Sequence, residues 1–544
     1  MALPPVPAEP SAPALPSAVA LVQAGLARHQ AGQADEAERF YRAALAVDAD
    51  EPNALHLWGL LAKAGNRLEL AASLIRRAIA ILPELAAMHA NLGNVLRAAG
   101  QDEAAVGCFH QALALEPDFA EARFALAVTL HSLGRQDAAL PVYARLLQQA
   151  PWHRDAAFNM GVACQNIGRL EPAVALYRRV LVQEPAYALA HNNLSATLRH
   201  QARLPEAIIA AGRALALEPG LGEAAKNLAF ACLLLGDYDR GLPAYEGRRQ
   251  AVDGHIPTLS VPEWRGEPLK GDSILLLAEQ GLGDTLQMVR YAPLLKARGA
   301  GPVLLACPAP LLRLLRGAAG LDAVLPREGS IPRPQWYLPL MSLPYRCGTT
   351  LATIPAPVPY LQADPALCRH WQTRLAALES QGAPGGKAIV PPRQRVGLVW
   401  AGNPGHRGDR LRSQRLENFL PLLRARPDFR WYGLQLGVGR RDLEEAALPD
   451  GFVDLGPEIA DFADTAAIIA NLDRVIAVDT SVAHLAGALG KPVWILLPFV
   501  PDWRWMMQRS DSPWYPTARL FRQTDPAGFA EVFAALAQAL LALP

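Results

Sequence analysis

Along residues 19–250, small, apolar and polar positions recur with a period of 34 residues. One small position recurs in every period, at Gly25, Gly59, Gly93, Ala127, Gly161, Ser195 and Ala229. A second recurs at Ala37, Ala71, Ala105, Ala139, Ala173, Ala207 and Gly241, and a larger position at Tyr41, Ile75, Phe109, Tyr143, Tyr177 and Tyr245, with Ala211 in the sixth period. Small residues let two helices approach closely, and a larger side chain fills the gap to the next pair. A proline ends most periods, where it stops a helix. The pattern therefore predicts an array of helix pairs.

This period and its residue pattern resemble the tetratricopeptide repeat. The resemblance implies about seven repeats over residues 19–251, stacked as an all-α superhelix with a concave groove. Residues 1–18 are rich in Pro and Ala and are expected to form a disordered tail. Residues 252–270 are rich in Pro and Gly and are expected to form a linker.

A column of carboxamides accompanies the first small position, two residues before it. Its members are Asn91, Asn159, Asn193 and Asn227. Carboxamides both donate and accept hydrogen bonds, so a column of them can hold the backbone of an extended peptide whatever its sequence. The column resembles the asparagine ladder of protein O-linked N-acetylglucosamine transferases, which also join such repeats to a glycosyltransferase. We expect it to line an acceptor-peptide groove; the alternative is a set of exposed polar positions without a partner.

The second half of the chain alternates apolar strands with helices, which predicts parallel, doubly wound sheets. Strands are expected at 273–278, 302–307 and 323–325, within a first lobe at 271–380. A hinge rich in Gly and Pro is expected at 381–394, and further strands at 395–400, 429–436 and 475–478 within a second lobe at 395–544. The last helix is expected to start at Asp525-Pro526 and to stay on the second lobe or return to the first.

The stretch 474–497 reads as a strand, a sharp turn, a short helix and a second strand. Asp479, Thr480 and Ser481 follow the first strand, and all three are residue types that cap helix N-termini. A helix that begins at the carboxyl end of a parallel strand presents free N–H groups and a positive dipole end, which suits phosphate. His484 lies in the first turn of that helix, so its ring is expected near the same place. The alternative is a buried structural unit whose polar residues only cap the helix.

Two further loops carry candidate functional residues. After the strand at 273–278 come Gln280, Gly281, Gly283 and Asp284, where glycines allow a tight turn and close approach of a ligand. Asp284 lies where open α/β sheets bind ligands, although it can equally cap the following helix. The loop at 401–413 is long and basic, and its arginines suit a diphosphate.

The motifs GLGD at 281–284 and DTSVAHLAGALGKP at 479–492 resemble glycosyltransferase family 9, the heptosyltransferases, and two lobes joined by a hinge resemble the GT-B architecture. The resemblance implies that Asp284 is the general base. It implies a donor site formed by Arg412, Gln435, Asp479, Thr480, Ser481 and His484, with Gln280, Gly281 and Gly283 in the first-lobe loop. Arg412 stands where that family has a lysine. The layout is also similar to that of bacterial flagellin glycosyltransferases.

The resemblance implies an inverting, metal-independent transfer of a sugar from a nucleotide-sugar substrate to a protein acceptor, with no resident cofactor. No DxD motif and no cluster of His and Cys offers itself as a metal site. Two alternatives remain. One is a catalytically inactive repeat scaffold whose α/β half binds a nucleotide or glycan. The other is a transferase that acts on a polysaccharide or a lipid-linked glycan.

Composition and charge bear on the binding partners and on the cellular compartment of the protein. The net charge of +1 gives no field that would favour nucleic acid or an anionic membrane. No apolar run is long enough to predict a membrane span. The six cysteines form no CxxC pair, and the N-terminus lacks the features of a signal peptide. These features predict a cytoplasmic protein.

Overall fold

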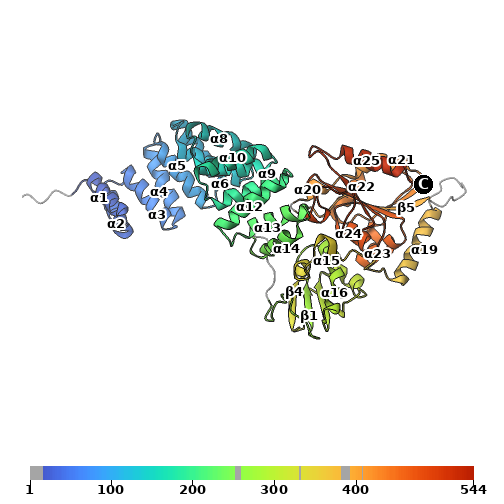
Figure 1. Ribbon diagram of the computed structural model, residues 1–544. Coiled ribbons are helices and arrows are strands. Elements are labelled where there is room, and N and C mark those ends of the chain that lie inside the picture. Colours follow the sequence, from blue (N-terminus) through green and yellow to red (C-terminus); the bar gives the residue numbers. More distant parts are fainter. Residues whose placement is uncertain (1–15, 252–258, 330–331, 382–392, 407) are drawn as a thin grey trace, which may run out of the picture. The chain divides into compact units, whose positions relative to one another are not determined.

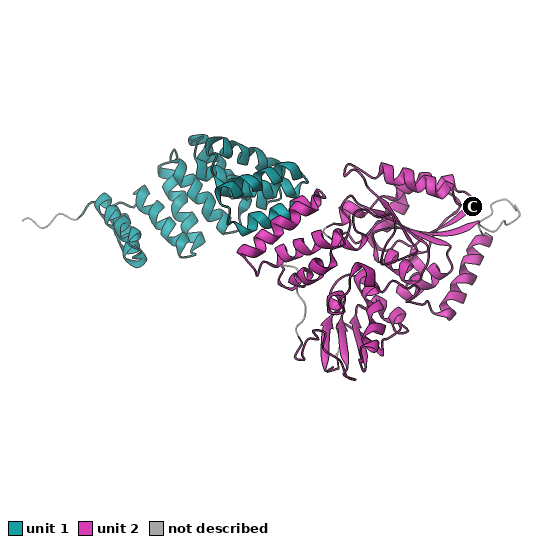
Figure 2. Ribbon diagram, viewed as in Figure 1, with its two compact units in different colours: residues 1–197 teal, residues 198–544 magenta. Residues whose placement is uncertain are grey.

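The computed structural model describes residues 16–251, 259–329, 332–381, 393–406 and 408–544. They form two compact units, residues 1–197 and residues 198–544 (Figure 2). The predicted disordered tail lies almost wholly outside the described residues, as does most of the predicted hinge; the first helix begins at Ala18.

The first unit is built from successive helix pairs (Figure 1). They are α1 (Ala18–Gln30), α2 (Ala34–Val47), α3 (Pro52–Ala64), α4 (Leu68–Ile81), α5 (Ala86–Ala98), α6 (Asp102–Leu115), α7 (Ala120–Ser132), α8 (Gln136–Gln149), α9 (Arg154–Asn166) and α10 (Leu170–Gln183), followed by α11 (Ala188–His200), which crosses into the second unit. The recurrent glycines explain the close pairing: a Cβ on Gly93 would lie 2.6 Å from Cε1 of Phe109. The predicted tetratricopeptide superhelix is confirmed.

The second unit starts with the remaining repeat helices and continues into a four-stranded parallel sheet. The helices are α12 (Leu204–Leu217), α13 (Gly222–Leu234), α14 (Tyr238–Tyr245) and the 3-10 helix η1 (Glu246–Gln250). The sheet has the order β3-β2-β1-β4, with β1 (Ile274–Leu277), β2 (Val303–Cys307), β3 (Ala323–Pro326) and β4 (Trp336–Pro339). The helices of this first lobe are α15 (Leu282–Met288), α16 (Ala292–Ala297), α17 (Leu312–Leu315) and α18 (Leu343–Arg346). Strand β4 was not among the predicted strands.

The described end of the predicted linker joins this sheet. The backbone N–H of Trp264 donates to the Tyr337 carbonyl at 2.9 Å, and Glu263 forms a parallel bridge with the same residue. The side chain of Trp264 is fully buried. Residues 263–264 therefore extend the edge of the first lobe at β4.

The second sheet has six parallel strands in the order β10-β9-β8-β5-β6-β7. Its strands are β5 (Gln394–Val399), β6 (Phe429–Gly433), β7 (Phe452–Asp454), β8 (Arg474–Val478), β9 (Val493–Leu497) and β10 (Ala518–Arg522). In chain order within the lobe this is the 3-2-1-4-5-6 arrangement, whose direction of winding reverses between β5 and β8. Ligands of such sheets bind beyond the carboxyl ends of the strands at that reversal. The predicted parallel sheets are confirmed.

Helices cover both faces of the second sheet (Figure 1). Helices α21 (Leu420–Ala425) and α25 (Ala530–Leu541) lie on one face, and α19 (Pro365–Gln381), α23 (Phe462–Ala470) and α24 (Ser481–Ala488) lie on the other. Two boundaries differ from the prediction. Helix α19 packs on α23, where Trp371 Nε1 donates to Asp464 at 3.2 Å, so residues 365–381 belong with the second sheet. Helix α25 begins at Ala530 and packs on α21 and β10, so it does not return to the first lobe.

Candidate functional site

Helix α15 of the first lobe packs directly against helix α24 of the second, and this contact brings two of the predicted motifs together. A Cβ added to Gly283 would lie 2.7 Å from Cδ2 of His484 and 3.4 Å from the Cα of Ser481. Any side chain larger than glycine at residue 283 would therefore push the helices apart. The GLGD loop and the DTS turn therefore lie side by side and form the candidate site.

Asp284 is the third residue of α15. Its Oδ2 accepts a hydrogen bond from the Gly281 backbone N–H at 2.8 Å, so Asp284 does cap the helix. Its Oδ1 forms an ion pair with Arg504 of the second lobe. Burial raises the pKa of Asp284 above its ordinary value, and the charge of Arg504 opposes that rise. The carboxylate thus serves as a cap and also faces the other lobe.

Arg504 is the central cation of this site, and sequence reasoning missed it. Its side chain is buried, and it binds Asp502 Oδ1 at 2.8 Å and the side chains of Asp284 and Gln287. Burial alone would lower the pKa of Arg504, but Asp502 and Asp284 raise it, so the guanidinium stays charged. The signal was the run DWRW at 502–505, which follows β9 closely but belongs to no motif that we used.

The N-terminus of α24 has the features of an anion site. Thr480 stands at the N-cap in extended conformation, and its side chain makes no capping hydrogen bond. Its Oγ1 is buried and, among the described residues, has no hydrogen-bond partner. Ser481, the first helical residue, is partly exposed. An unpartnered buried hydroxyl is uncommon in folded proteins and calls for a bound group or water.

Asp479 precedes this N-terminus and His484 is the fourth residue of α24, with His484 Nε2 3.9 Å from Asp479 Oδ1. Burial, together with the charge of Asp502, raises the pKa of Asp479 to about 6. Burial and the charge of Arg504 lower the pKa of His484 to about 3, so the imidazole is neutral at physiological pH. Its Nδ1 hydrogen-bonds the Tyr515 hydroxyl at 2.9 Å, and its ring stacks on Trp505.

Arg412 lies at the end of the short helix α20 (Asp409–Arg412) in the predicted basic loop. Its Nε is 3.3 Å from Asp409 Oδ1, and its charge is close enough to lower the pKa of Asp479. The loop therefore brings a cation to the same site as the α24 N-terminus.

Two residues predicted to belong to the site make hydrogen bonds within the protein. The carboxamide of Gln435 bonds only main-chain groups: it accepts from the N–H groups of Trp400 and Ala401 and donates to the carbonyls of Ala401 and Leu436, at 2.9–3.1 Å. These hydrogen bonds brace the carboxyl end of β5, and contact of Gln435 with the donor stays a prediction. Gln280 accepts a hydrogen bond at 3.1 Å from the hydroxyl of Tyr245 in α14.

The asparagine column divides between the two units. In the first unit, Asn91 hydrogen-bonds His56 at 2.9 Å and Asn193 accepts from Asn192 at 3.1 Å. Asn159, like these two, is partly exposed. Asn227 belongs to the second unit and is only 6% exposed, so its carboxamide is not presented to a peptide as predicted. Three members of the column thus remain accessible.

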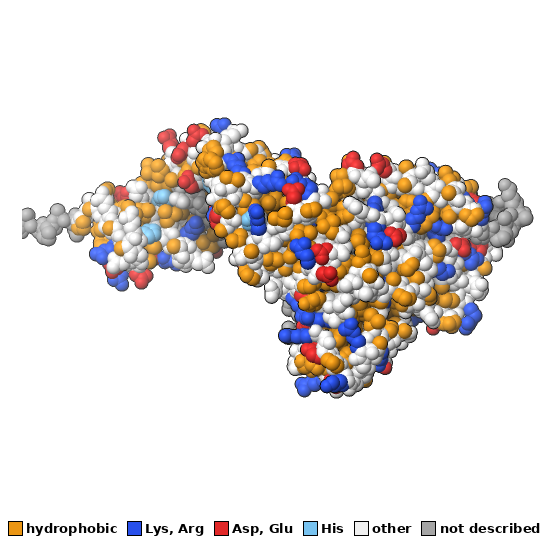
Figure 3. Space-filling view, viewed as in Figure 1, with side chains coloured by type: hydrophobic (Ala, Val, Ile, Leu, Met, Phe, Trp, Pro, Cys, Tyr) orange, Lys and Arg blue, Asp and Glu red, His pale blue; other side chains and the backbone are white. Residues whose placement is uncertain are grey.

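The surface charges and the described metal-ligating residue types indicate no further site. Charges of both signs are interspersed on the face shown in Figure 3. In the part of the chain that the structure describes, no three His, Cys, Asp or Glu side chains are grouped to hold a metal ion. Among the same residues, no helix has both the length and the apolar character that crossing a membrane requires.

Comparison with known proteins identifies the repeats. Tetratricopeptide repeat models match residues 18–51 and 91–151. Protein FlbA of Caulobacter vibrioides is 27% identical over 321 residues, which are 53% of this chain and 50% of FlbA, so the match spans about half the length of that relative.

Solved structures are similar at lower coverage. YrrB, described as a tetratricopeptide repeat protein with an unusual peptide-binding site, is 22% identical, with 34% of this chain and 95% of that chain covered and a TM-score of 0.32. PilF of Pseudomonas aeruginosa is 19% identical, with 38% and 94% covered and a TM-score of 0.34.

Proposed function

We propose that this protein is an inverting glycosyltransferase that moves a sugar from a nucleotide-sugar to a protein acceptor held by its tetratricopeptide repeats. The observation that carries the proposal is the contact between α15 and α24. This contact brings Asp284 close to the N-terminus of α24, where the buried Thr480 hydroxyl has no hydrogen-bond partner among the described residues. Two parallel sheets whose site lies at the carboxyl ends of their strands are also what the GT-B architecture requires.

The donor's diphosphate is assigned to the N-terminus of α24. The free N–H groups of the first turn and the helix dipole attract negative charge. The Thr480 hydroxyl can donate a hydrogen bond to the diphosphate, and Arg412 adds a positive charge nearby. These groups stabilise the charge that develops on the leaving nucleoside diphosphate, which is the largest electrostatic requirement of the reaction.

Asp284 is assigned as the general base. Its carboxylate takes the proton of the acceptor hydroxyl while the hydroxyl oxygen attacks the anomeric carbon. The bond from that carbon to the diphosphate oxygen breaks on the opposite side, so the anomeric configuration inverts. A base benefits from a raised pKa, which burial gives to Asp284. Arg504, held by Asp502, keeps the carboxylate in place through the ion pair between the lobes.

The acceptor is assigned to the repeats because the accessible carboxamides of Asn91, Asn159 and Asn193 can bond any peptide backbone. Intact-mass spectrometry of secreted and surface proteins, from cells with and without the gene, tests this assignment. Loss of one or more sugar masses from a protein in the deletion strain is the expected result. Identical masses, together with no turnover of any nucleotide-sugar by the purified protein, would contradict the proposal.

One observation favours the alternative of an inactive, ligand-binding α/β region. Both oxygens of Asp284 already have partners, namely the Gly281 N–H and Arg504. On that alternative Asp284 is a structural bridge between the lobes. Calorimetry that finds nucleotide-sugar binding, with no hydrolysis or transfer over many hours, would support it.

A further inference from the structure

The end of the repeat array contacts both lobes within the second unit. Towards the second lobe, Trp514 Nε1 donates to the Tyr238 hydroxyl at 3.0 Å, and the Met507 N–H donates to the Leu234 carbonyl at 3.2 Å. Towards the first lobe, the Tyr245 hydroxyl donates to Gln280. The last repeat, α13 and α14 with η1, is therefore packed against the groups that surround the candidate site.

Arg248 of η1 makes a buried ionic contact with the first lobe. Its side chain is 5% exposed and its partner Glu279 is 3% exposed. Arg248 Nη2 donates to Glu279 Oε1 at 2.7 Å and to Ser342 Oγ at 2.9 Å, while Nη1 donates to Glu246 at 2.7 Å. The same Glu279 oxygen accepts from the Met341 N–H at 3.3 Å. One arginine of the repeat array thus joins the carboxyl ends of β1 and β4.

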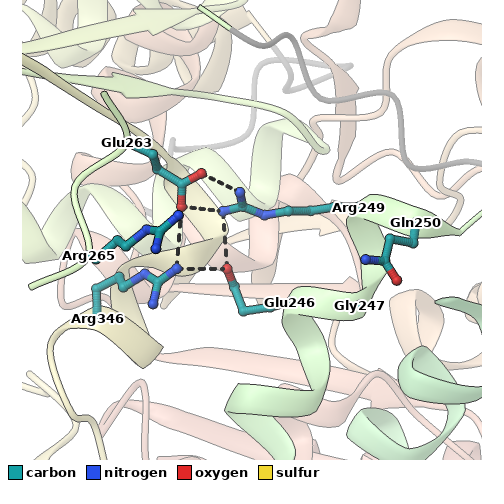
Figure 4. Close-up of a pocket in the computed structure, with 7 residues that line it drawn as sticks. All are labelled: Glu246, Gly247, Arg249, Gln250, Glu263, Arg265 and Arg346. Carbon is teal, nitrogen blue, oxygen red and sulfur yellow. Dashed lines mark hydrogen bonds and ion pairs between the residues drawn. The ribbon is translucent and has the colours of Figure 1, made fainter. Parts of the chain in front are cut away.

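The neighbouring arginine, Arg249, forms a more exposed pair. Arg249 donates to the same Ser342 Oγ at 3.0 Å and lines a charged pocket with Glu246, Gly247, Gln250, Glu263, Arg265 and Arg346 (Figure 4). It pairs there with Glu263 and is 26% exposed. Such pairs contribute little to stability. A buried pair such as Arg248–Glu279 is often no more stabilising than apolar side chains, because both charges lose their hydration. Its value lies in fixing a geometry.

The geometry that it fixes is that of the proposed catalytic loop. Glu279 and Gln280 are held by Arg248 and Tyr245, and they immediately precede Gly281, whose N–H binds Asp284. We infer that the last repeat is a positioning element of the site: Tyr245 and Arg248 set the place of Asp284 opposite Arg504. The catalytic consequence rests on the proposed function, whereas the effect on the loop itself does not.

Two variants test this inference. Tyr245→Phe removes only the hydroxyl that binds Gln280. Arg248→Met combined with Glu279→Gln removes both charges, so that neither is left buried alone. Tyr177→Phe is the matched control, since Tyr177 occupies the equivalent repeat position and its hydroxyl also donates to a glutamine, Gln165, at 2.9 Å. Arg240→Ala, which loses only a pair with Asp237 in the last repeat, controls for loss of a surface arginine.

Hydrogen exchange of peptides covering residues 278–288 gives a readout that does not depend on activity. We expect exchange at Gly281 and Thr285 to accelerate at least fivefold in both test variants and to stay unchanged in both controls. Unaltered protection of the loop in the two test variants would overturn the inference, even if the protein proves not to be a transferase.

Turnover of the nucleotide-sugar separates positioning from binding. In Tyr245→Phe we expect kcat to fall about tenfold with KM for the donor within twofold of wild type, because the base is misplaced and the donor site is intact. A loosened loop with wild-type kcat would overturn the catalytic part. Absence of turnover in the wild-type protein would instead refute the proposed function and leave the exchange result standing.

Discussion

The repeats and the candidate site use the same packing device for different ends. In the repeats, Gly93 lets the ring of Phe109 reach the backbone of the facing helix, and Gly161 does the same for Tyr177. In the site, Gly283 lets the ring of His484 approach equally closely. The first two contacts recur every 34 residues and bury apolar rings. The third occurs between two lobes and buries an imidazole among charged groups.

The difference shows which contacts stabilise the fold and which ones serve the candidate site. A contact that recurs in a solenoid adds similar stability at each unit. A solitary contact that surrounds charged groups with protein adds little stability, since burying them without water is unfavourable. The site holds a buried arginine, a neutral histidine and a hydroxyl without a partner among the described residues. Such groups are expected where a ligand completes the arrangement.

The largest effect is expected for Asp284→Asn. The amide oxygen can still accept from the Gly281 N–H, so the fold should persist, but no base is left to take the acceptor proton. We expect transfer to fall about 10²- to 10⁴-fold with donor affinity unchanged, measured by product formation and calorimetry.

Asp322→Asn is the control for this variant, because Asp322 forms a partly exposed ion pair with Lys296 in the same lobe. It should transfer at the wild-type rate. Wild-type transfer by Asp284→Asn would remove Asp284 from the mechanism.

Replacing a repeat glycine and the site glycine by alanine tests the comparison between the repeats and the site. Gly93→Ala places a Cβ 2.6 Å from Phe109 and should destabilise the repeats by about 1–2 kcal/mol, the overpacking being partly offset by better helix propensity. Gly283→Ala should instead lower transfer at least tenfold by separating α15 from α24. Urea unfolding followed by circular dichroism reports the first change, and the transfer rate reports the second.

Gly107→Ala in α6 provides the control, because a Cβ there meets nothing within 4 Å. It should stabilise the protein by about 0.5–1 kcal/mol. Normal transfer by Gly283→Ala would show that the lobes need not meet at this point.

Substitution of Asn159 and Asn193 by Ala tests the role given to the repeats. Each lost hydrogen bond is worth about 1 kcal/mol, so we expect KM of the double variant for a protein acceptor to rise about 30-fold while donor hydrolysis is unchanged. Gln111→Ala, on the exposed surface of α6, should leave both values at wild type. Equal acceptor KM in all three proteins would favour a polysaccharide or lipid-linked acceptor.

For Asp479→Asn we expect a smaller effect, a gain in the free energy of unfolding that depends on pH. The pKa of Asp479 is raised in the folded protein to about 6, so ionisation penalises folding as pH rises from about 4 to 6. The variant avoids this penalty. Because Asp479 lies close to Asp502, we expect a gain of only about 1 kcal/mol at pH 7.5 and none at pH 4.

Tryptophan fluorescence in urea measures this gain, because nine of the 11 tryptophans lie in the second unit. A stability difference that does not change between pH 4 and pH 7.5 would show that Asp479 ionises normally.

The sequence predicts the repeats and the parallel sheets because both have a regular signal. Spacing of Gly, Ala and aromatic residues reports helix pairs, and apolar runs report buried strands. Two site motifs were also predictable, since Asp284 and Thr480 each follow a strand of a parallel sheet, and such sheets bind ligands at the carboxyl ends of their strands.

The other site residues had no such signal. Arg504 reaches Asp284 from a distant part of the chain, and Arg248 reaches Glu279 from the repeats. Neither contact leaves a spacing that can be read locally. For Gln435, whether a buried carboxamide bonds main chain or ligand likewise depends on strands that only the fold brings together.

The most direct test of the central claim is calorimetric titration with UDP, GDP and CDP. If the N-terminus of α24 holds the leaving diphosphate, at least one should bind the wild-type protein. Thr480→Val and Arg412→Ala should each weaken it at least tenfold, whereas Arg415→Ala, which loses an exposed pair with Glu445, should not. Failure of all three nucleotides to bind, or binding that neither Thr480→Val nor Arg412→Ala weakens, would contradict the account.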